Sequence, residues 1–183
     1  MGNFLELLTS TLTQGFLYAL LAYGIYITYK ILDFPDLTVD GSFPLGAAVT
    51  AVLLTHGSNP YLTLLAAVAV GALAGLATGL IHVCLKVRDL LAGIITTTAL
   101  FSLNLQIAGS NLTVERAVET IFTAPPTMAL FGGMTLLYRK LIVSFLLVLL
   151  LKLLLDLYFK TKNGLLLRAV GDNETLVTTL AKN

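Results

Sequence analysis

The chain has 183 residues, of which 57% are hydrophobic and only 11% are charged, and its formal net charge is +1. Soluble domains usually carry about 25% charged residues, so this composition excludes a chain whose whole surface faces water. The mean hydropathy of +0.90 indicates an integral membrane protein. The small net charge provides no broad basic field, which argues against a nucleic-acid-binding protein.

Metal and disulfide chemistry have little support in the sequence. Cys84 is the only cysteine, so no internal disulfide can form. Cys84 also has no cysteine or histidine partner at metal-ligand spacing, and His56 and His82 are far apart in sequence. We therefore expect no bound metal and no cofactor.

The first apolar stretch covers residues 11–32 and is long enough to cross the hydrocarbon core. No basic residue precedes Lys30, so the N-terminus does not resemble a signal peptide. We expect this stretch to be retained as a membrane span.

An irregular segment of three acids, a proline and a glycine follows at residues 33–41. The next apolar stretch, residues 42–55, is too short for an ordinary span and predicts a half-helix or broken helix, with Asp40 or Ser42 as its N-cap and Pro44 in its first turn. Broken helices line substrate paths in transporters, although an interfacial loop before a short tilted span is the alternative. The candidate pathway residues here are Asp36, Thr38, Asp40 and Ser42.

Two further spans are predicted at residues 61–83 and 90–109. In the first, Gly71, Gly75 and Gly79 recur every four residues and predict a helix face that another helix can approach closely. The second carries an unusual polar load, from which Thr97 and Asn104 are the candidate pathway residues. Hydroxyl bonds back to the helix's own carbonyls are the alternative for its threonines.

The last predicted span covers residues 141–159 and contains Lys152 and Asp156, four positions apart, which we expect to pair. Residues 160–183 form a polar tail. With the loop at Lys86 and Arg88 in the cytoplasm, seven basic residues lie inside and three outside, which places the N-terminus outside and the tail in the cytoplasm.

The predicted fold class is an all-α transmembrane bundle of four or five spans that includes one short or broken helix. Residues 1–159 form the membrane region, and residues 160–183 form a cytoplasmic segment.

Two motifs in this order resemble a known family, the permeases of branched-chain amino acid, ribose and related ABC importers. Residues 32–47 are similar to the family's segment after the first span, and their Asp-Leu-Thr-Val-Asp-Gly form is closest to a subgroup of uncharacterised or aromatic-amino-acid permeases. Residues 167–174, Leu-Arg-Ala-Val-Gly-Asp-Asn-Glu, are similar to the family's cytoplasmic stretch that contacts the ATPase subunit. Because the family continues with more spans, the resemblance implies the N-terminal part of a permease.

The resemblance implies a transport subunit rather than an enzyme, in the bacterial cytoplasmic (inner) membrane, moving an amino acid or similar small solute by alternating access. The implied partners are an ABC ATPase subunit, a second permease subunit in a homodimer and an extracytoplasmic substrate-binding protein. No Walker A motif occurs in the chain, so ATP hydrolysis would belong to a partner. The ATPase-coupling residues implied by the motif are Arg168, Gly171, Asp172, Asn173 and Glu174.

Two alternatives remain open at this point. Asp33, Asp36 and Asp40 are spaced like acids that hold Mg²⁺ in membrane-embedded transferases. A non-catalytic membrane scaffold is the other alternative.

Overall fold

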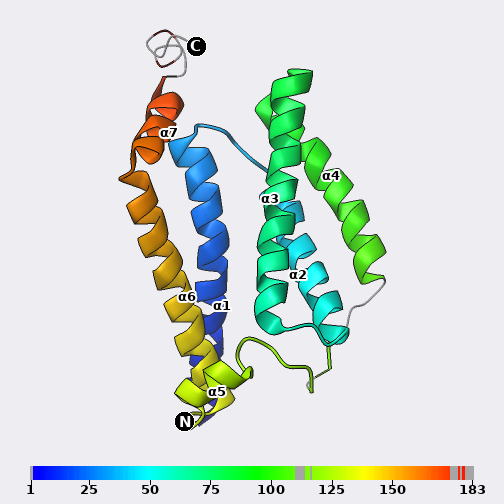
Figure 1. The fold of residues 1–183 in the computed structure, drawn as a ribbon, viewed down its shortest axis with the longest axis vertical. Helices are drawn as coiled ribbons and strands as arrows, with labels where there is room; N and C mark the ends of the chain where they lie inside the picture. The colour runs from blue at the N-terminus through cyan, green and yellow to red at the C-terminus, as the bar shows by residue number, and fades with distance from the viewer. Residues whose placement is uncertain (1, 110–113, 116, 174–176, 178, 180–183) are drawn as a thin grey trace. The chain divides into compact units, whose positions relative to one another are not determined.

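A computed structural model describes residues 2–109, 114–115, 117–173, 177 and 179, and all regular elements among them are helical (Figure 1). In chain order they are α1 Gly2–Tyr26, the π-helix η1 Ile27–Ile31, α2 Val39–Thr55, α3 Pro60–Leu85, α4 Asp89–Ala108, α5 Pro125–Phe131, α6 Leu136–Phe159 and α7 Lys162–Asp172.

Four of these segments are long and apolar enough to cross a membrane, and α2 is a shorter apolar helix. The four are Phe4–Ile31, Pro60–Leu85, Asp89–Ala108 and Leu136–Phe159. The predicted fold class, an all-α membrane protein with one short helix, is confirmed.

The distribution of side chains is that of a protein whose solvent is lipid. Large apolar side chains point outward on the long helices, such as Leu73 at 63% exposure and Leu150 at 60%. Small polar side chains occupy the interior, where Thr63 and Thr78 are 1% and 2% exposed. Hydroxyl groups avoid hydrocarbon and find partners between helices, so the interior is the more polar part.

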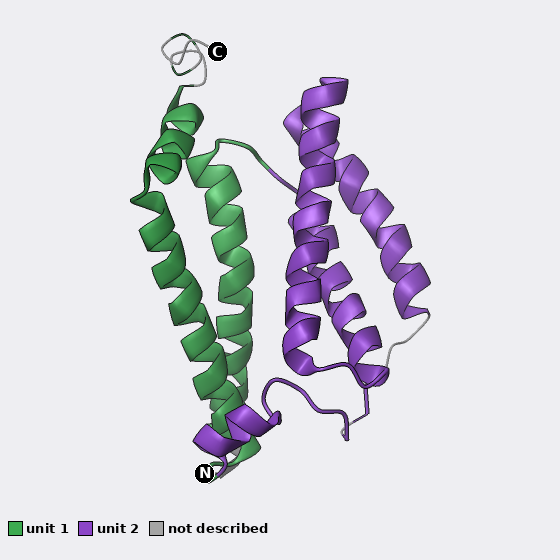
Figure 2. Cartoon of the chain, viewed as in Figure 1, with its two compact units in different colours: residues 1–35, 133–183 green, residues 36–132 purple. Residues whose placement is uncertain are grey.

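The chain forms two compact units, residues 1–35 with 133–183 and residues 36–132 (Figure 2). In the first unit α1 packs along α6, and the rings of Phe16 and Phe145 lie 5.3 Å apart. The short helix α7 packs against α6 and η1. A long helical pair therefore carries a small helix at one end.

In the second unit α2 packs against both α3 and α4 (Figure 1). Leu45, Ala74 and Leu100, one from each helix, form its core. A four-residue turn joins α2 to α3, with Gly57 in the left-handed region at φ +76°. Asn59 then caps α3 by accepting a 3.0 Å hydrogen bond from the Tyr61 N–H, and Pro60 fills the first helical position.

The predicted start of the short helix is wrong by a few residues. Helix α2 begins at Val39 after Thr38, neither Asp40 nor Ser42 is its N-cap, and Pro44 lies inside the helix rather than in its first turn. The reason is local: the Asp36 carboxylate accepts the Thr38 N–H at 2.8 Å and turns the chain into the helix earlier. Because Pro44 has no N–H, the Asp40 carbonyl lacks its usual helical donor.

The pairing predicted for Lys152 and Asp156 is not made. Both side chains are exposed on α6, and no ion pair joins them in the described chain.

Candidate substrate pathway at the start of helix α2

The first turn of α2 lies part-way along the two longer helices of its unit. Thr38 contacts Thr78, which lies seven residues before the end of α3, and the Leu37 carbonyl contacts Thr97, eight residues after the start of α4. At the helical rise these positions are about 10 and 12 Å from the nearest helix ends. With α3 and α4 spanning the membrane, which their length and apolar composition allow, α2 would begin within its depth.

A buried hydroxyl pair holds α2 to α3. The Oγ1 atoms of Thr38 and Thr78 are 2.6 Å apart, and both side chains are 2% exposed. The Thr78 hydroxyl also donates to the Ala74 carbonyl of its own helix at 3.2 Å. Thr78 can therefore accept from Thr38 while its own proton remains bonded, so both hydroxyls are satisfied without water.

Two side chains of α4 hold the other side of the same segment. The Thr97 hydroxyl donates to the Leu37 carbonyl at 2.7 Å, and the Asn104 Nδ2 donates to the Gly41 carbonyl at 3.2 Å. The Asn104 Oδ1 is buried and has no hydrogen-bond partner in the described chain. Side chains of α4 thus bond to two backbone carbonyls at the start of α2, those of Leu37 and Gly41, as irregular backbone within a membrane requires.

Two glycines allow this close approach. A Cβ on Gly41 would lie 3.0 Å from the Leu100 Cβ and 3.2 Å from the Thr97 Cα. A Cβ on Gly93 would lie 3.0 Å from the Leu37 nitrogen. All three distances are shorter than ordinary van der Waals contact, so the close packing of α4 against the start of α2 depends on the absence of a side chain at Gly41 and Gly93.

Four of the six predicted pathway residues come together at this point: Asp36, Thr38, Thr97 and Asn104. Asp40 is exposed, and Ser42 makes only a long 3.5 Å bond to the Val39 carbonyl of its own helix. Sequence reasoning missed Thr78, Gly41 and Gly93. The only two threonines of the apolar span 61–83 are Thr63 and Thr78, and their presence among apolar residues was the available signal for Thr78.

The sequence left two roles open for the threonines of α4, contact with another segment and bonds to the helix's own carbonyls, and both roles occur. Thr96 and Thr98 donate to the Ala92 and Ile94 carbonyls of their own helix, at 3.0 and 2.8 Å. Thr97, between them, is the one that reaches another segment. Helical geometry explains this division because neighbouring positions point about 100° apart.

Replacing Thr97 with valine is expected to lower the free energy of unfolding by about 1 kcal/mol, because the Leu37 carbonyl then keeps only its 3.3 Å bond from the Asp40 N–H. Thr98→Val is the matched control and should have a smaller effect, since its hydroxyl bond is local and exposed. Thermal unfolding of the two purified variants in detergent measures the difference. Equal midpoints would contradict the assignment of Thr97.

The predicted glycine strip of α3 has no neighbour in the part of the chain that the structure describes. A Cβ on Gly71, Gly75 or Gly79 would meet nothing within 4 Å. Close packing of another helix on this face stays a prediction.

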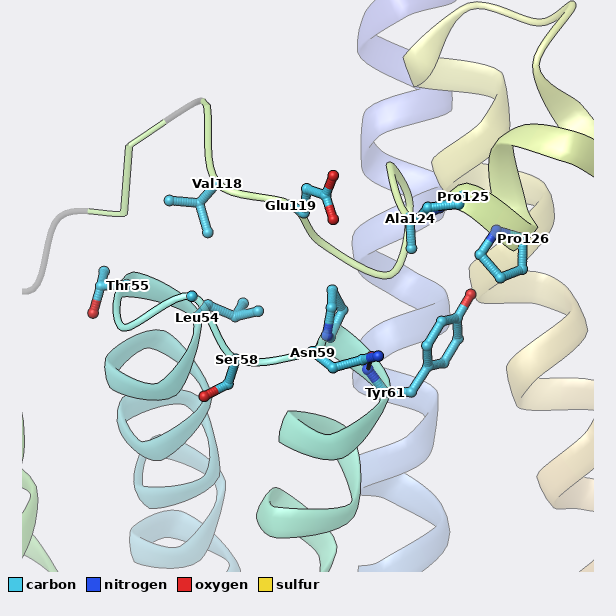
Figure 3. A pocket seen from close by; sticks show the side chains of 12 residues that line it. Leu54, Thr55, Ser58, Asn59, Tyr61, Val118, Glu119, Ala124, Pro125 and Pro126 are labelled. Atoms are coloured by element: carbon cyan, nitrogen blue, oxygen red, sulfur yellow. Dashed lines mark hydrogen bonds between the residues drawn. The ribbon is translucent and has the colours of Figure 1, made fainter.

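A pocket of about 610 Å³ lies at the opposite end of α2 and α3 from the Asp36 segment. The α2–α3 turn forms one side of it, and Val118, Glu119 and Ala124 lie across from the turn (Figure 3). The Tyr61 hydroxyl at its edge is 3.3 Å from the Thr127 hydroxyl. It contains none of the predicted site residues.

The predicted coupling residues lie in and after α7. The Arg168 guanidinium lies 5.2 Å from the centre of the Phe159 ring, and Gly171 packs against η1. Asp172 and Asn173 are exposed at the end of the helix, and Glu174 lies outside the described residues. Leu165 and Leu166 on the same helix are 57% and 54% exposed.

Residues 2–109, 114–115, 117–173, 177 and 179 contain no group of three or more His, Cys, Asp or Glu side chains that could hold a metal ion. Asp33, Asp36 and Asp40, from which the alternative of a magnesium-dependent transferase was drawn, do not form such a group.

Comparison with known families decides the assignment of the chain. Residues 7–183 match the family described as "Branched-chain amino acid transport system / permease component". The chain belongs to this permease family. It is therefore a membrane protein by family as well as by its helices.

Two curated relatives are similar over nearly the whole chain. A "Tyrosine transport system permease protein" of Clostridioides difficile (strain R20291) is 36% identical over 174 residues, which cover 95% of this chain and 55% of the relative. An "Uncharacterized protein RP368" of Rickettsia prowazekii (strain Madrid E) is 32% identical over 179 residues, which cover 97% of this chain and 59% of that protein. The permease thus spans between half and two thirds of the length of these relatives. No solved structure matches it.

Proposed function

We propose that this permease forms part of the translocation path of an ABC importer for an amino acid, with a tyrosine-like substrate as the first candidate. The observation that carries the proposal is the start of α2 at membrane depth, held by Thr78, Thr97 and Asn104. The substrate class rests on the tyrosine transport permease to which the chain is 36% identical.

The geometry at this point suits a path for a zwitterion. The partial positive charge at the start of α2 favours a carboxylate, while the Asp36 side chain and the Asp40 carbonyl favour an ammonium group. The N–H groups of Asp40, Gly41 and Ser42 already bond to the Leu37 and Thr38 carbonyls, so the helix contributes mainly through its charge. The bonds to α3 and α4 hold this polar backbone in place between apolar helices. A small rotation of α4 would alter the bonds that Thr97 and Asn104 make to the Leu37 and Gly41 carbonyls. The start of α2 would then face a different side of the membrane.

The partners follow from the same proposal. A second permease subunit, by homodimerisation, would complete the path, and an extracytoplasmic binding protein would deliver the substrate. An ABC ATPase would bind α7 in the cytoplasm of a bacterium, with the N-terminus of the permease outside, as the distribution of lysine and arginine favours. The exposed Leu165 and Leu166 of α7 would provide the apolar contact with that ATPase.

The test is to co-express the permease with a candidate ABC ATPase from the same genome and to purify the pair in mild detergent. The unchanged chain should capture the ATPase, and the double substitution Leu165→Glu, Leu166→Glu should reduce capture about tenfold or more, because two charges replace the apolar contact. Leu130→Glu on α5 is the control, since Leu130 is also an exposed leucine, at 78%, and should leave capture unchanged.

Uptake of radiolabelled tyrosine by vesicles that contain the complete transporter checks the substrate. If the unchanged chain captures no ATPase, the proposed function is wrong. If capture occurs but tyrosine neither enters nor competes with other amino acids, only the substrate class is wrong.

A further inference from the structure

A second cavity, of about 510 Å³, lies where helices α1 and α6 begin, wholly within the unit of residues 1–35 and 133–183. Leu5 and Glu6 line it from the first turns of α1, and residues 135–138 and Lys140 line it from the start of α6. Its lining is made of apolar and hydroxyl-bearing side chains with two opposite charges, those of Glu6 and Lys140. None of the candidate pathway residues takes part in it.

The two charges of the cavity do not neutralise each other. Glu6 and Lys140 are both exposed, and no ion pair joins them among the residues described. The neighbouring cation, Arg139, is used by the protein itself, since it is 6% exposed and donates to the Met134 carbonyl at 3.1 Å. The cavity therefore presents one carboxylate and one ammonium group to a ligand.

The cavity lies at the depth of lipid headgroups when α1 and α6 span the membrane, as their length and composition allow. Glu6 is two residues after Phe4, and Lys140 is four residues after Leu136, where the two apolar spans begin. At the helical rise these separations are about 3 and 6 Å. The headgroup layer is about 5–7 Å thick on each side of a bilayer, so both charges lie close to it.

An apolar strip leads away from the cavity along α1. Leu5, Leu8 and Leu12 share one face of this helix and are 53%, 46% and 47% exposed. An acyl chain needs such a surface beside its headgroup. At the start of α6, Thr135 makes no side-chain cap bond, and the partial positive charge of the helix end favours an anion such as a phosphate.

We propose that this cavity binds the headgroup of an aminophospholipid, a lipid that carries both a phosphate and a primary ammonium group, as phosphatidylethanolamine does. Lys140 and the start of α6 bind the phosphate, and Glu6 binds the ammonium group. An acyl chain lies along Leu5, Leu8 and Leu12. The carboxylate decides the class of lipid, because it repels a headgroup that is only anionic. The inference goes beyond transport and depends neither on the solute nor on the ATPase.

The experiment measures lipid binding to the purified full chain in detergent by native mass spectrometry. Phosphatidylethanolamine and phosphatidylglycerol are added with the same acyl chains, since phosphatidylglycerol has the phosphate but no ammonium group. We expect phosphatidylethanolamine to bind about two- to fivefold more tightly, the effect of one exposed ion pair. Equal binding of the two lipids would overturn the inference.

Single substitutions assign the two charges. Glu6→Gln should lower the affinity for phosphatidylethanolamine about two- to fivefold without lowering that for phosphatidylglycerol. Lys140→Gln should lower the affinity for both lipids, because both carry the phosphate. Since both side chains are exposed, folding should be retained. Asp156→Asn and Lys160→Gln are the matched controls, because they remove exposed charges at the other end of α6 and should change neither affinity.

Two further outcomes would contradict the site. Equal loss of both lipids in Glu6→Gln would mean that the carboxylate does not bind the ammonium group. Equal effects of the control substitutions would mean that lipid binds to charges anywhere on the surface. Failure of the unchanged chain to capture an ATPase would instead concern only the proposed function.

Discussion

Replacing Thr78 with valine is expected to lower the free energy of unfolding by about 1–3 kcal/mol, because it leaves the Thr38 hydroxyl buried without a partner. Thr38→Val should have a smaller effect, since Thr78 keeps its bond to the Ala74 carbonyl and Thr38 makes no side-chain cap bond to α2. The double valine variant should be closer to the unchanged chain than Thr78→Val alone, because both hydroxyls are then absent.

Thermal unfolding of the purified protein in detergent measures these differences, at about 2–4 °C for each kcal/mol in a chain of this size. Thr96→Val is the matched control. The Thr96 side chain is also buried, with an exposed fraction of 4%, but its hydroxyl bonds only to its own helix. If Thr96→Val and Thr78→Val lower the midpoint equally, the bond between α2 and α3 has no special role.

Replacing Gly41 with alanine is expected to destabilise the protein by about 1–3 kcal/mol, although the same change usually stabilises a helix. The added methyl group would lie 3.0 Å from the Leu100 Cβ and 3.2 Å from the Thr97 backbone, so α4 must move away from α2. That movement would also stretch the bonds from Thr97 and Asn104. Transport by the complete importer should therefore fall together with stability.

Gly46 provides the comparison, in the same helix. An alanine there would place its Cβ 3.8 Å from the Ala67 Cβ, an ordinary contact, and should be neutral or stabilising by about 0.5–1 kcal/mol. The two variants thus have opposite expected signs in the same unfolding measurement. Destabilisation by both would mean that α2 tolerates no added volume anywhere, and the special closeness at Gly41 would be refuted.

Composition and apolar length were enough to predict the fold class. The break after residue 32 and the short stretch 42–55 also predicted that one helix would be shorter than a span, as α2 is. The exact start of α2 could not be predicted, because it depends on the Asp36 carboxylate bonding to the Thr38 N–H rather than on the preference of Asp40 or Ser42 for caps. Capping preferences are averages, and one local turn outweighs them.

The candidate site was predictable in part. Polar residues in an apolar helix need partners, which pointed to Thr97 and Asn104. Nothing in the local sequence distinguishes Thr97 from Thr98, since only the position of α2 decides which hydroxyl reaches another backbone. Gly93 and Gly41 look like ordinary small residues until the two helices are placed side by side.

The four-residue turn between α2 and α3 has a consequence for biosynthesis. Helix α2 has 17 residues, with Asp40 in its first turn and Pro44 further inside, so we expect it to enter lipid alone less readily than the longer helices. Joined so tightly to the strongly apolar α3, it would enter the bilayer as one half of a helical hairpin. The carbonyls of Leu37 and Gly41 would then gain their side-chain donors only after α4 is synthesised and supplies Thr97 and Asn104.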